Sequence, residues 1–386
     1  MATRHTGRVS SSPGDVDQGG LEQVSRVDRV ASLTGIRAVA ALLVMGTHAA
    51  YGTGAYHRGY LGMMFARMEI GVAIFFVLSG FLLFTGWVRA AATDAPAPRV
   101  RRYARSRVRR IMPAYAVTVL LAYLLYEFRD IDPNPGHHWT GLVRHLTLTQ
   151  IYGTPTLHQG LTQMWSLAVE VAFYAALPAL AYLLLVLLCR RRWRPGVLLA
   201  GLALLGALSP LWLVVLHTTD WLPAGAGLWL PHYLVWFVGG MALTVLARTG
   251  FRCYTVAAVP LAVVTYLVVS TPIGGRIDAP ALDLGQDVVK VMCYAAIATL
   301  VVAPLALGDK GVYSRILSSR PMVWLGEISY EIFLLHVIVM EIVMVSVLGW
   351  PLYTGSVVVL FSVTLALTIP AAWLLHRLTR PRTQQV

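Results

Sequence analysis

The chain has 386 residues, of which 57% are hydrophobic and only 13% are charged, and its mean hydropathy is +0.66. A soluble domain of this size would carry more charge, so the composition excludes a soluble globular protein and predicts a polytopic membrane protein. The net charge of +13 does not indicate a nucleic-acid partner, because the cations lie in short loops between apolar runs and no aromatic-basic recognition module accompanies them.

The N-terminal segment is polar, rich in Ser and Gly, and has neither an early apolar core nor a small-residue cleavage site. We therefore expect residues 1–31 to form a disordered cytoplasmic tail and not a signal peptide. Residues 32–377 are expected to form one membrane domain, and residues 378–386 a short cytoplasmic tail. The sequence shows no internal repeat and no linker long enough to carry a separate soluble domain.

Apolar runs of about 17 to 25 residues predict about ten membrane-spanning helices and therefore an all-α bundle. The runs are centred near residues 42, 80, 119, 176, 207, 238, 263, 298, 337 and 365. The connecting loops alternate in charge. The basic groups are Arg26 with Arg29, 99–110, 189–194, Arg248 with Arg252, 310–320 and 376–382. By the positive-inside rule both termini are cytoplasmic, which agrees with an even number of helices.

The first apolar run, 34–52, keeps Arg37 near one end and His48 near the other. A central Arg in hydrocarbon costs about 2.5 to 3.5 kcal/mol on insertion scales, so retained ionisable groups indicate a use. Eleven residues are about three helical turns, which places both side chains on one face, about 16 Å apart along the axis. A ligand that reaches both must be long, anionic at its cytoplasmic end and reactive at its outer end.

An acyl-coenzyme A has this shape, with phosphates for arginines at the cytoplasmic mouth and a thioester that can reach the imidazole. Histidine titrates near neutrality and can remove a proton from an acceptor hydroxyl, which is typically worth 10² to 10⁴ in rate. The alternative is a snorkelling Arg37 and a His48 bonded to a neighbouring helix. These two residues alone are compatible with both interpretations, a donor-binding pair and a structural pair.

Five stretches occur in a characteristic order: TGIRAVAALLVMGTH (34–48), IGVAIFFVLSGFLLF (70–84), RYARSRVRRIMPAY (102–115), QMWSLAVEVAFYAALP (163–178) and WLGEISYEIFLLH (324–336). Together, on ten predicted helices, they closely resemble the acyltransferase-3 family of membrane O-acyltransferases. The resemblance covers nearly all of residues 33–376. It implies transfer of an acyl group, such as acetyl or succinyl, from a cytoplasmic donor, usually acyl-coenzyme A, to a hydroxyl of an envelope carbohydrate, glycolipid or small glycoside.

The family's arginine and histidine pair maps onto Arg37 and His48, and its arginine motif before helix three maps onto Arg107 and Arg110. The sequence departs from the family at two positions. Thr34 stands where an Asp is frequent, and Ala73 stands where an acidic residue often precedes the FFVLSGF run. Glu69, one turn earlier, is a candidate substitute for the second.

Most cations of 99–110 serve as topology signals. Arg107 and Arg110 are the better candidates for phosphate binding, because they lie three residues apart and share a helix face. Glu170, an intramembrane carboxylate, could orient His48 and stabilise its imidazolium, or could pair with a cation of another helix as a structural contact.

Other polar and aromatic residues have weaker signals. Ser79 and Gly80 are expected to permit close helix packing, with Ser79 also lining the donor path. Trp165 and Tyr174 are candidates for substrate binding or for an interfacial belt. Tyr330 and His336, with Ser329 and Glu331, are candidates for donor or acceptor contacts. The outer loop contains three histidines, which are interpreted as ordinary surface residues: His137, His138 and His158. That loop is long enough to shape an entrance for the acceptor.

The three cysteines, Cys189, Cys253 and Cys293, lack metal-type spacing, so the sequence predicts neither a disulfide framework nor a metal site. No serine or cysteine has an activating neighbour in sequence, which favours direct attack by the acceptor hydroxyl, with His48 as base, over a covalent enzyme intermediate.

The alternative function is a lipid or small-molecule transporter or flippase, which ten helices and buried charges also suit. Such transporters often have two related halves, and here the motifs of helices one to four have no counterparts in six to nine. The Arg- and Ala-rich composition suggests a high-GC bacterium and a place in its cytoplasmic membrane, in contact with membrane lipids. Compatible actinobacterial acceptors are a trehalose ester such as a trehalose mycolate, an arabinan or lipoglycan, or a macrolide sugar.

Overall fold

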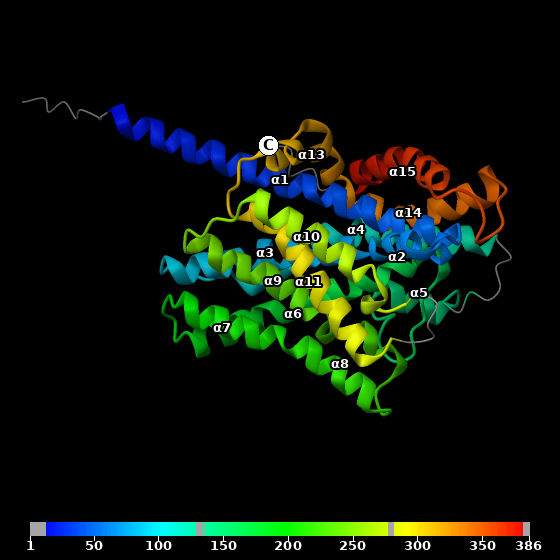
Figure 1. The fold of residues 1–386 in the computed structure, drawn as a ribbon, viewed down its shortest axis with the longest axis horizontal. Coiled ribbons are helices and arrows are strands. Elements are labelled where there is room, and N and C mark those ends of the chain that lie inside the picture. The colour runs from blue at the N-terminus through cyan, green and yellow to red at the C-terminus, as the bar shows by residue number, and fades with distance from the viewer. Residues whose placement is uncertain (1–12, 129–133, 135, 277–281, 381–386) are drawn as a thin grey trace, which may run out of the picture.

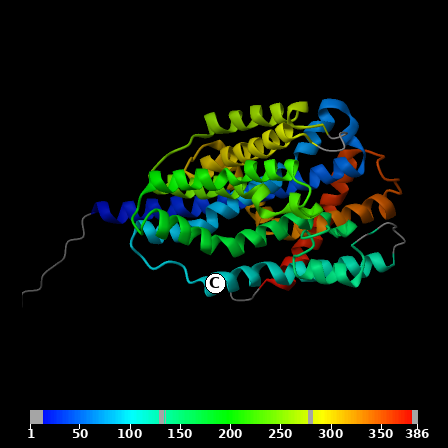
Figure 2. The same cartoon turned by 90° about the horizontal axis from the view of Figure 1, so that it is seen from below.

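The computed structural model describes residues 13–128, 134, 136–276 and 282–380, with side chains from residue 30 onward. These residues form helices, turns and loops without any strand, so the predicted all-α class is confirmed. Figure 1 shows the helices packed side by side, mostly along the long axis of the molecule, and Figure 2 gives the same arrangement from below.

The helices of the first half are α1 (Pro13–Gly52), α2 (Gly59–Arg67), α3 (Ile70–Ala92), α4 (Val100–Glu127), α5 (Trp139–Leu146), α6 (Trp165–Ala181), α7 (Pro195–Gly206) and α8 (Leu208–Thr218). Those of the second half are α9 (Leu230–Arg248), α10 (Thr255–Val269), α11 (Leu284–Ala306), α12 (Val312–Leu317), α13 (Arg320–Glu327), α14 (Ser329–Ile342) and α15 (Val357–Thr379). Short 3₁₀ or π segments extend several of them: Ala55–His57, Gln159–Met164, Tyr182–Leu188, Ala224–Leu228, Pro272–Gly274 and Val343–Val347.

Nine described helical segments are long and apolar enough to cross a membrane: Val30–Gly52, Gly59–Ala92, Val100–Glu127, Gln159–Leu188, Pro195–Thr218, Ala224–Arg248, Leu284–Ala306, Ser329–Val347 and Val357–Thr379. The remaining predicted run, near residue 263, forms the 15-residue helix α10. At 1.5 Å per residue this helix is about 22 Å long, which is less than the roughly 30 Å of a hydrocarbon core. It packs beside α11 as a shorter tenth helix.

The first helix begins earlier than expected. Residues 13–31 are helical, where the sequence predicts a disordered tail, and residues 1–12 lie outside the described residues. Figure 1 shows this part of α1 projecting beyond the bundle. No proline follows Pro13 before Val30, and adding turns to a helix that is already nucleated costs far less than starting one. At the other end α15 continues to Thr379, and residues 381–386 lie outside the described residues.

Helices α3 and α9 approach closely at two glycines. A Cβ atom on Gly80 would lie 2.1 Å from the carbonyl oxygen of Phe237, and one on Gly240 would lie 1.9 Å from that of Val77. Only glycine fits such backbone contacts. The close packing expected at Gly80 is therefore confirmed, and it fixes the position of α3, which carries one wall of the site described below.

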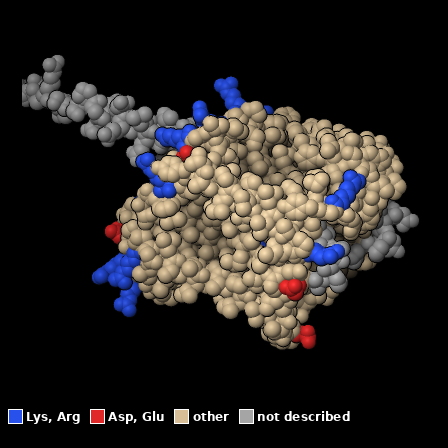
Figure 3. All heavy atoms as spheres, viewed as in Figure 1, with Lys and Arg blue, Asp and Glu red and all other residues tan. Residues whose placement is uncertain are grey.

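The surface reflects a membrane setting. Figure 3 shows a flank almost without charged side chains, with Lys and Arg gathered mainly toward the end at which α7 begins in Figure 1. An apolar flank of this kind suits contact with lipid chains. That end carries the loops that the positive-inside rule predicts to be cytoplasmic, and "cytoplasmic" and "outer" are used below in this predicted sense.

Candidate active site

A cavity of about 520 Å³ lies between the cytoplasmic parts of α1, α4, α14 and α15. We call it the cationic vestibule. Among its described lining residues are seven arginines: Arg37, Arg102, Arg105, Arg107, Arg109, Arg110 and Arg380. Two acids, Glu327 and Glu331, and His376 also line it. The strong excess of guanidinium groups suits a ligand with several phosphate charges.

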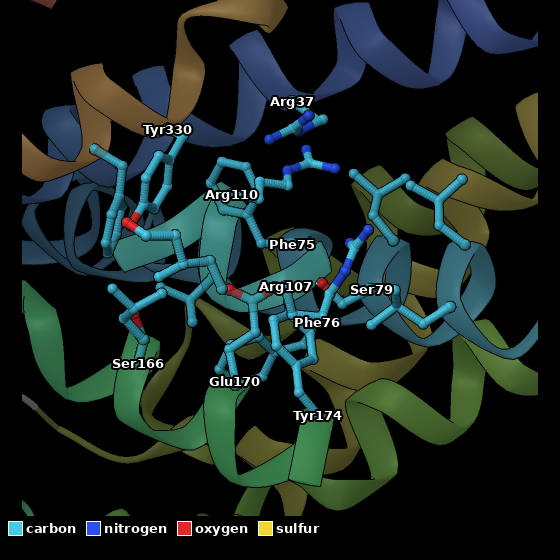
Figure 4. A pocket seen from close by; sticks show the side chains of 17 residues that line it. Arg37, Phe75, Phe76, Ser79, Arg107, Arg110, Ser166, Glu170, Tyr174 and Tyr330 are labelled. Atoms are coloured by element: carbon cyan, nitrogen blue, oxygen red, sulfur yellow. Dashed lines mark hydrogen bonds between the residues drawn. The ribbon is translucent and has the colours of Figure 1, made fainter. Parts of the chain in front are cut away.

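A second cavity of about 110 Å³, which we call the inner pocket, lies between α1, α3, α4, α6 and α14. It shares Arg37, Arg107, Arg110 and Tyr330 with the cationic vestibule, so the two cavities adjoin. Figure 4 shows the three arginine side chains around the same space, Arg37 from α1 and Arg107 with Arg110 from α4. Its remaining walls are mostly apolar: Val72, Phe75, Phe76, Leu78, Leu82, Leu83, Ile111, Leu167 and Phe333.

The structure thus brings together the three arginines that the sequence singled out. Arg37 and Arg107 are half-buried, and Arg110 is exposed. The Nε atom of Arg107 is buried without a hydrogen-bond partner, while its Nη2 atom donates to Ser106 Oγ at 3.2 Å. A buried cationic donor without a partner is costly. An anionic ligand oxygen would supply the missing acceptor.

Glu170 of α6 lies in the inner pocket and not beside His48. Its Oε1 atom accepts hydrogen bonds from Ser79 Oγ of α3 and from the Tyr174 hydroxyl, the latter at 2.6 Å. The carboxylate also interacts electrostatically with Arg37 and Arg107. The expectation that Glu170 orients His48 is therefore wrong for this structure, because α6 packs against α3 and α9 whereas His48 faces α14. The alternative interpretation, pairing with a cation of another helix, stays a prediction, because the observed contacts of Glu170 are the hydrogen bonds from Ser79 and Tyr174.

His48 is fixed in one tautomer by its own helix. Its Nδ1 atom lies 2.8 Å from the carbonyl oxygen of Val44, which can only accept, so Nδ1 carries the proton. The Nε2 atom then keeps its lone pair, and no described residue forms a hydrogen bond with it. His48 therefore has the tautomer that a general base needs.

His336 of α14 is the neighbour of His48. Its Nε2 atom lies 3.4 Å from His48 Nδ1, and the two rings are nearly perpendicular, with centroids 5.0 Å apart. His336 Nδ1 donates to the carbonyl oxygen of Phe333 at 2.8 Å, so its Nε2 atom is an acceptor that faces the His48 proton. The sequence ranked His336 as a possible substrate contact, and the structure places it in contact with His48.

Two phenylalanines separate the inner pocket from this histidine pair. Phe75 and Phe333 both line the pocket, and their ring centroids are 6.2 Å apart. The ring of His336 lies 5.9 Å from that of Phe333. Phe333 therefore adjoins both the inner pocket and His336. The sequence analysis did not predict this position of the two rings, although Phe75 is the first residue of the FFVLSGF run that it singled out.

The other predicted residues divide between the cavities and the scaffold. Tyr174 lines the inner pocket, and Tyr330 lines both cavities while its hydroxyl donates to the Ile111 carbonyl at 3.0 Å. Trp165 lines neither cavity and packs against Tyr233, with ring centroids 4.9 Å apart. Ser329 donates to the Gly326 carbonyl at 2.8 Å and is buried.

Glu331, which the sequence placed among the weaker candidates, is buried beside the cationic vestibule. Its Oε1 atom lies 2.9 Å from His376 Nδ1, a partner that the sequence analysis did not consider. The only available signal was the last basic cluster, which was interpreted as a topology determinant. Within the described residues, no group of three or more His, Cys, Asp or Glu side chains could hold a metal ion.

The outer-loop histidines are not all surface residues. His138 is exposed, but His158 is fully buried, with its Nε2 atom 3.1 Å from His137 Nδ1. The surface interpretation of His158 is therefore wrong. Burial, together with the charges that His137 and His145 can carry, lowers the pKa of His158 from 6.5 to about 3.

Comparison with known proteins finds a family model and relatives that match most of the chain. A family model described as an acyltransferase domain, that of acyltransferase-3, matches residues 30–377. The Acyltransferase MdmB of Streptomyces mycarofaciens is 30% identical over 383 residues, which cover 91% of this chain and 90% of that protein. The Peptidoglycan O-acetyltransferase OatA of Listeria monocytogenes is 26% identical over 347 residues, which cover 82% of this chain but 50% of that protein. No solved structure matches the chain.

Proposed function

The chain belongs to the acyltransferase-3 family, and from this premise we propose that it transfers an acyl group from a cytoplasmic acyl-coenzyme A to a hydroxyl of a cell-envelope glycolipid, glycan or small glycoside. That the chain is a membrane acyltransferase follows from the family and from its relatives. The donor, the acceptor class and the roles of individual residues are the proposal.

The observation that carries the proposal is the sequence of environments along one path. The cationic vestibule adjoins the inner pocket through shared arginines, and the apolar end of the pocket lies one aromatic layer from the histidine pair. Coenzyme A has matching parts in the same order: phosphates at one end, an extended pantetheine arm and a terminal thioester. The arginines would hold the phosphates, and the arm would pass between Phe75 and Phe333.

In the proposed reaction the acceptor hydroxyl oxygen attacks the thioester carbonyl carbon while His48 Nε2 takes the hydroxyl proton. The new C–O bond forms, the C–S bond breaks, and the leaving thiolate takes the proton from the imidazolium. His48 Nδ1–H faces the Val44 carbonyl at 2.8 Å and the lone pair of His336 at 3.4 Å. Both acceptors stabilise the imidazolium as it forms, which is the role that a carboxylate has in serine hydrolases.

Glu170 has a separate role in this proposal. Its carboxylate, held by Ser79 and Tyr174, keeps a negative charge among the arginines and so limits their mutual repulsion before the donor binds. It is then a positioning residue on the donor side. The phosphates of the donor would join this network instead of meeting an uncompensated cluster of cations.

The acceptor class is inferred from a named relative and from the composition of the chain. OatA is named as a peptidoglycan O-acetyltransferase, which makes a carbohydrate hydroxyl of the envelope a reasonable acceptor for this chain as well. The Arg- and Ala-rich composition favours acceptors of a high-GC bacterium, such as a trehalose ester. The bacterial cytoplasmic membrane is the location that this substrate pairing requires, since the donor is made in the cytoplasm.

The test is thioester consumption. Detergent-solubilised protein is given acetyl-coenzyme A or succinyl-coenzyme A with an envelope lipid and glycan extract, and free thiol and acylated products are measured. We expect thiol release that depends on the extract, together with one new acyl mass, and we expect neither with His48→Ala. If folded wild-type protein released no thiol with either donor, the donor assignment would be wrong. If thioester stayed intact and the same protein, reconstituted into lipid vesicles, moved lipid or solute across their membrane, a transporter would replace the proposal.

A further inference from the structure

A charged pair lies in the outer part of the bundle, outside both cavities. Glu69, at the turn between α2 and α3, has its Oε1 atom 2.7 Å from Lys290 Nζ of α11. The same oxygen accepts a hydrogen bond from the Tyr294 hydroxyl at 3.0 Å. Charged groups within membrane-spanning segments are costly and usually serve a function.

The pair is partly exposed, and not all of its hydrogen-bonding groups have partners. The side chains of Lys290 and Glu69 are 25% and 41% exposed. Among the described residues, the second carboxylate oxygen of Glu69 has no hydrogen-bond partner, and Lys290 Nζ has Glu69 as its one hydrogen-bond partner and the Tyr294 ring, 5.7 Å from its centroid, as a cation–π neighbour. Within a bundle, the attraction of an ion pair repays the cost of removing its charges from water only when the remaining donors and acceptors are satisfied. This pair instead offers an acceptor and two donors side by side.

The turn that carries Glu69 is bonded to the end of α10 and packs against α1. Arg67 is buried and donates to the carbonyl oxygens of Val269, Gly274 and Gly275, at 3.1, 2.7 and 2.5 Å. A Cβ atom on Gly46, two residues before His48, would lie 2.3 Å from the methyl carbon of Met68. Glu69 is also close enough to His48 to interact with it electrostatically. The charged pair thus lies near the proposed base, at the level of the α1 residues that precede His48.

The surroundings match the chemistry of a sugar. A hydroxyl both donates and accepts, so two neighbouring hydroxyls can bridge the pair, one donating to the free Glu69 oxygen and the other accepting from Lys290. Tyr294 itself is buried and packs beside Trp236, with ring centroids 5.9 Å apart, which fixes the hydroxyl that donates to Glu69. His232 and Asp287 interact electrostatically with Lys290 and extend the polar region.

We infer that Glu69, Lys290 and Tyr294 form the acceptor subsite, which binds neighbouring hydroxyls of a carbohydrate that arrives from the outer side of the membrane. This inference rests on the proposed function, because it assigns the second substrate of the same reaction. It gives Glu69 a ligand-binding role in place of the acidic residue that the family often has at the position of Ala73. The acceptor hydroxyls would then be held close to His48, outside the two donor cavities.

The first test is accessibility. Cysteine is placed at position 69 or 290 in a chain whose three natural cysteines are replaced by alanine, and a membrane-impermeant sulfonate methanethiosulfonate is added to intact cells or to inside-out vesicles. We expect labelling in intact cells and little labelling in the vesicles. Labelling only from the cytoplasmic side, or from neither side, would overturn the inference.

The second test separates binding from scaffolding. The double variant Glu69→Leu/Lys290→Met replaces the ion pair by apolar groups, which is often neutral for stability. We expect the half-saturating concentration of the envelope extract, with acetyl-coenzyme A as donor, to rise about 10- to 100-fold, as for a lost charge-assisted contact. Lys310→Met, an exposed lysine on the cytoplasmic side, is the matched control. Affinity for coenzyme A reports whether each variant is folded.

The outcomes distinguish the two claims. If wild-type protein consumes no thioester, the proposed function fails, whatever the labelling pattern. If wild-type protein transfers acyl groups and the folded double variant has the same half-saturating concentration as Lys310→Met, the acceptor subsite is wrong and the function stands.

Discussion

Arg107→Gln is the substitution that most directly examines the donor site. The guanidinium of Arg107 has a buried Nε atom without a partner and a single side-chain contact, to Ser106 one residue away. Because the side chain bonds to no other helix in the described residues, its removal should affect folding little. Its loss should instead lower the affinity for the ligand that completes its hydrogen bonds.

The magnitude follows from the lost contact. A hydrogen bond to a charged group contributes about 1.5 to 3 kcal/mol, which is roughly 10- to 100-fold in affinity at about 1.4 kcal/mol per factor of ten. Arg107 is half-buried and its neighbours are also cationic, so we expect the lower part of this range. Arg107→Lys should recover only part of the loss, because a point charge cannot donate two parallel bonds to a phosphate.

The assay is calorimetric titration of the purified protein with coenzyme A at two salt concentrations. Arg101→Gln is the matched control, since Arg101 is exposed on the same helix and lines neither cavity. An equal loss of coenzyme A affinity in both variants would mean that helix α4 attracts anions only through its overall charge. Unchanged affinity and salt dependence for Arg107→Gln would refute the donor site itself and return the arginine to a topology signal.

Four further predictions concern other parts of the chain. His48→Ala should lower turnover by about 10² to 10⁴ while coenzyme A affinity stays near the wild-type value, and near-normal turnover in a folded variant would contradict the role of base. Gly80→Ala should destabilise the bundle by about 1 to 3 kcal/mol, measured as a lower melting temperature, because its Cβ would overlap the Phe237 carbonyl. The loop around His158 should lose stability as pH falls from 6.5 toward 3, by up to about 1.4 kcal/mol per pH unit, since the unfolded histidine binds a proton in this window and the folded one does not. Faster hydrogen exchange of residues 137–160 at pH 5 than at pH 7, after correction for intrinsic rates, would report it, and equal protection would contradict it. Finally, cysteine at position 100 should react only from the cytoplasmic side, and labelling from outside would invert the proposed direction of transfer.

The amino-acid sequence by itself determined the class of the fold and most of its segments. Long apolar runs predict spanning helices because the bilayer core leaves backbone groups no other partners, so length and hydropathy suffice to locate them. The helical periodicity placed Arg37 and His48 on one face, and the spacing of Arg107 and Arg110 gave them a common direction. All of these are local properties, which a chain carries before its helices meet.

Only the tertiary structure decided which helices supply the partners. Glu170 and His336 both lie within apolar helices with no local signal for the side chain that they contact, and the structure joins Glu170 to Ser79 and His336 to His48. Likewise, Lys290 lies 221 positions after Glu69 along the chain and becomes its ion-pair partner through the packing of α11 against α3. Contacts between helices depend on how each helix rotates to bury its small and large side chains. In a bundle whose helices are apolar on nearly every face, hydropathy alone does not specify that rotation.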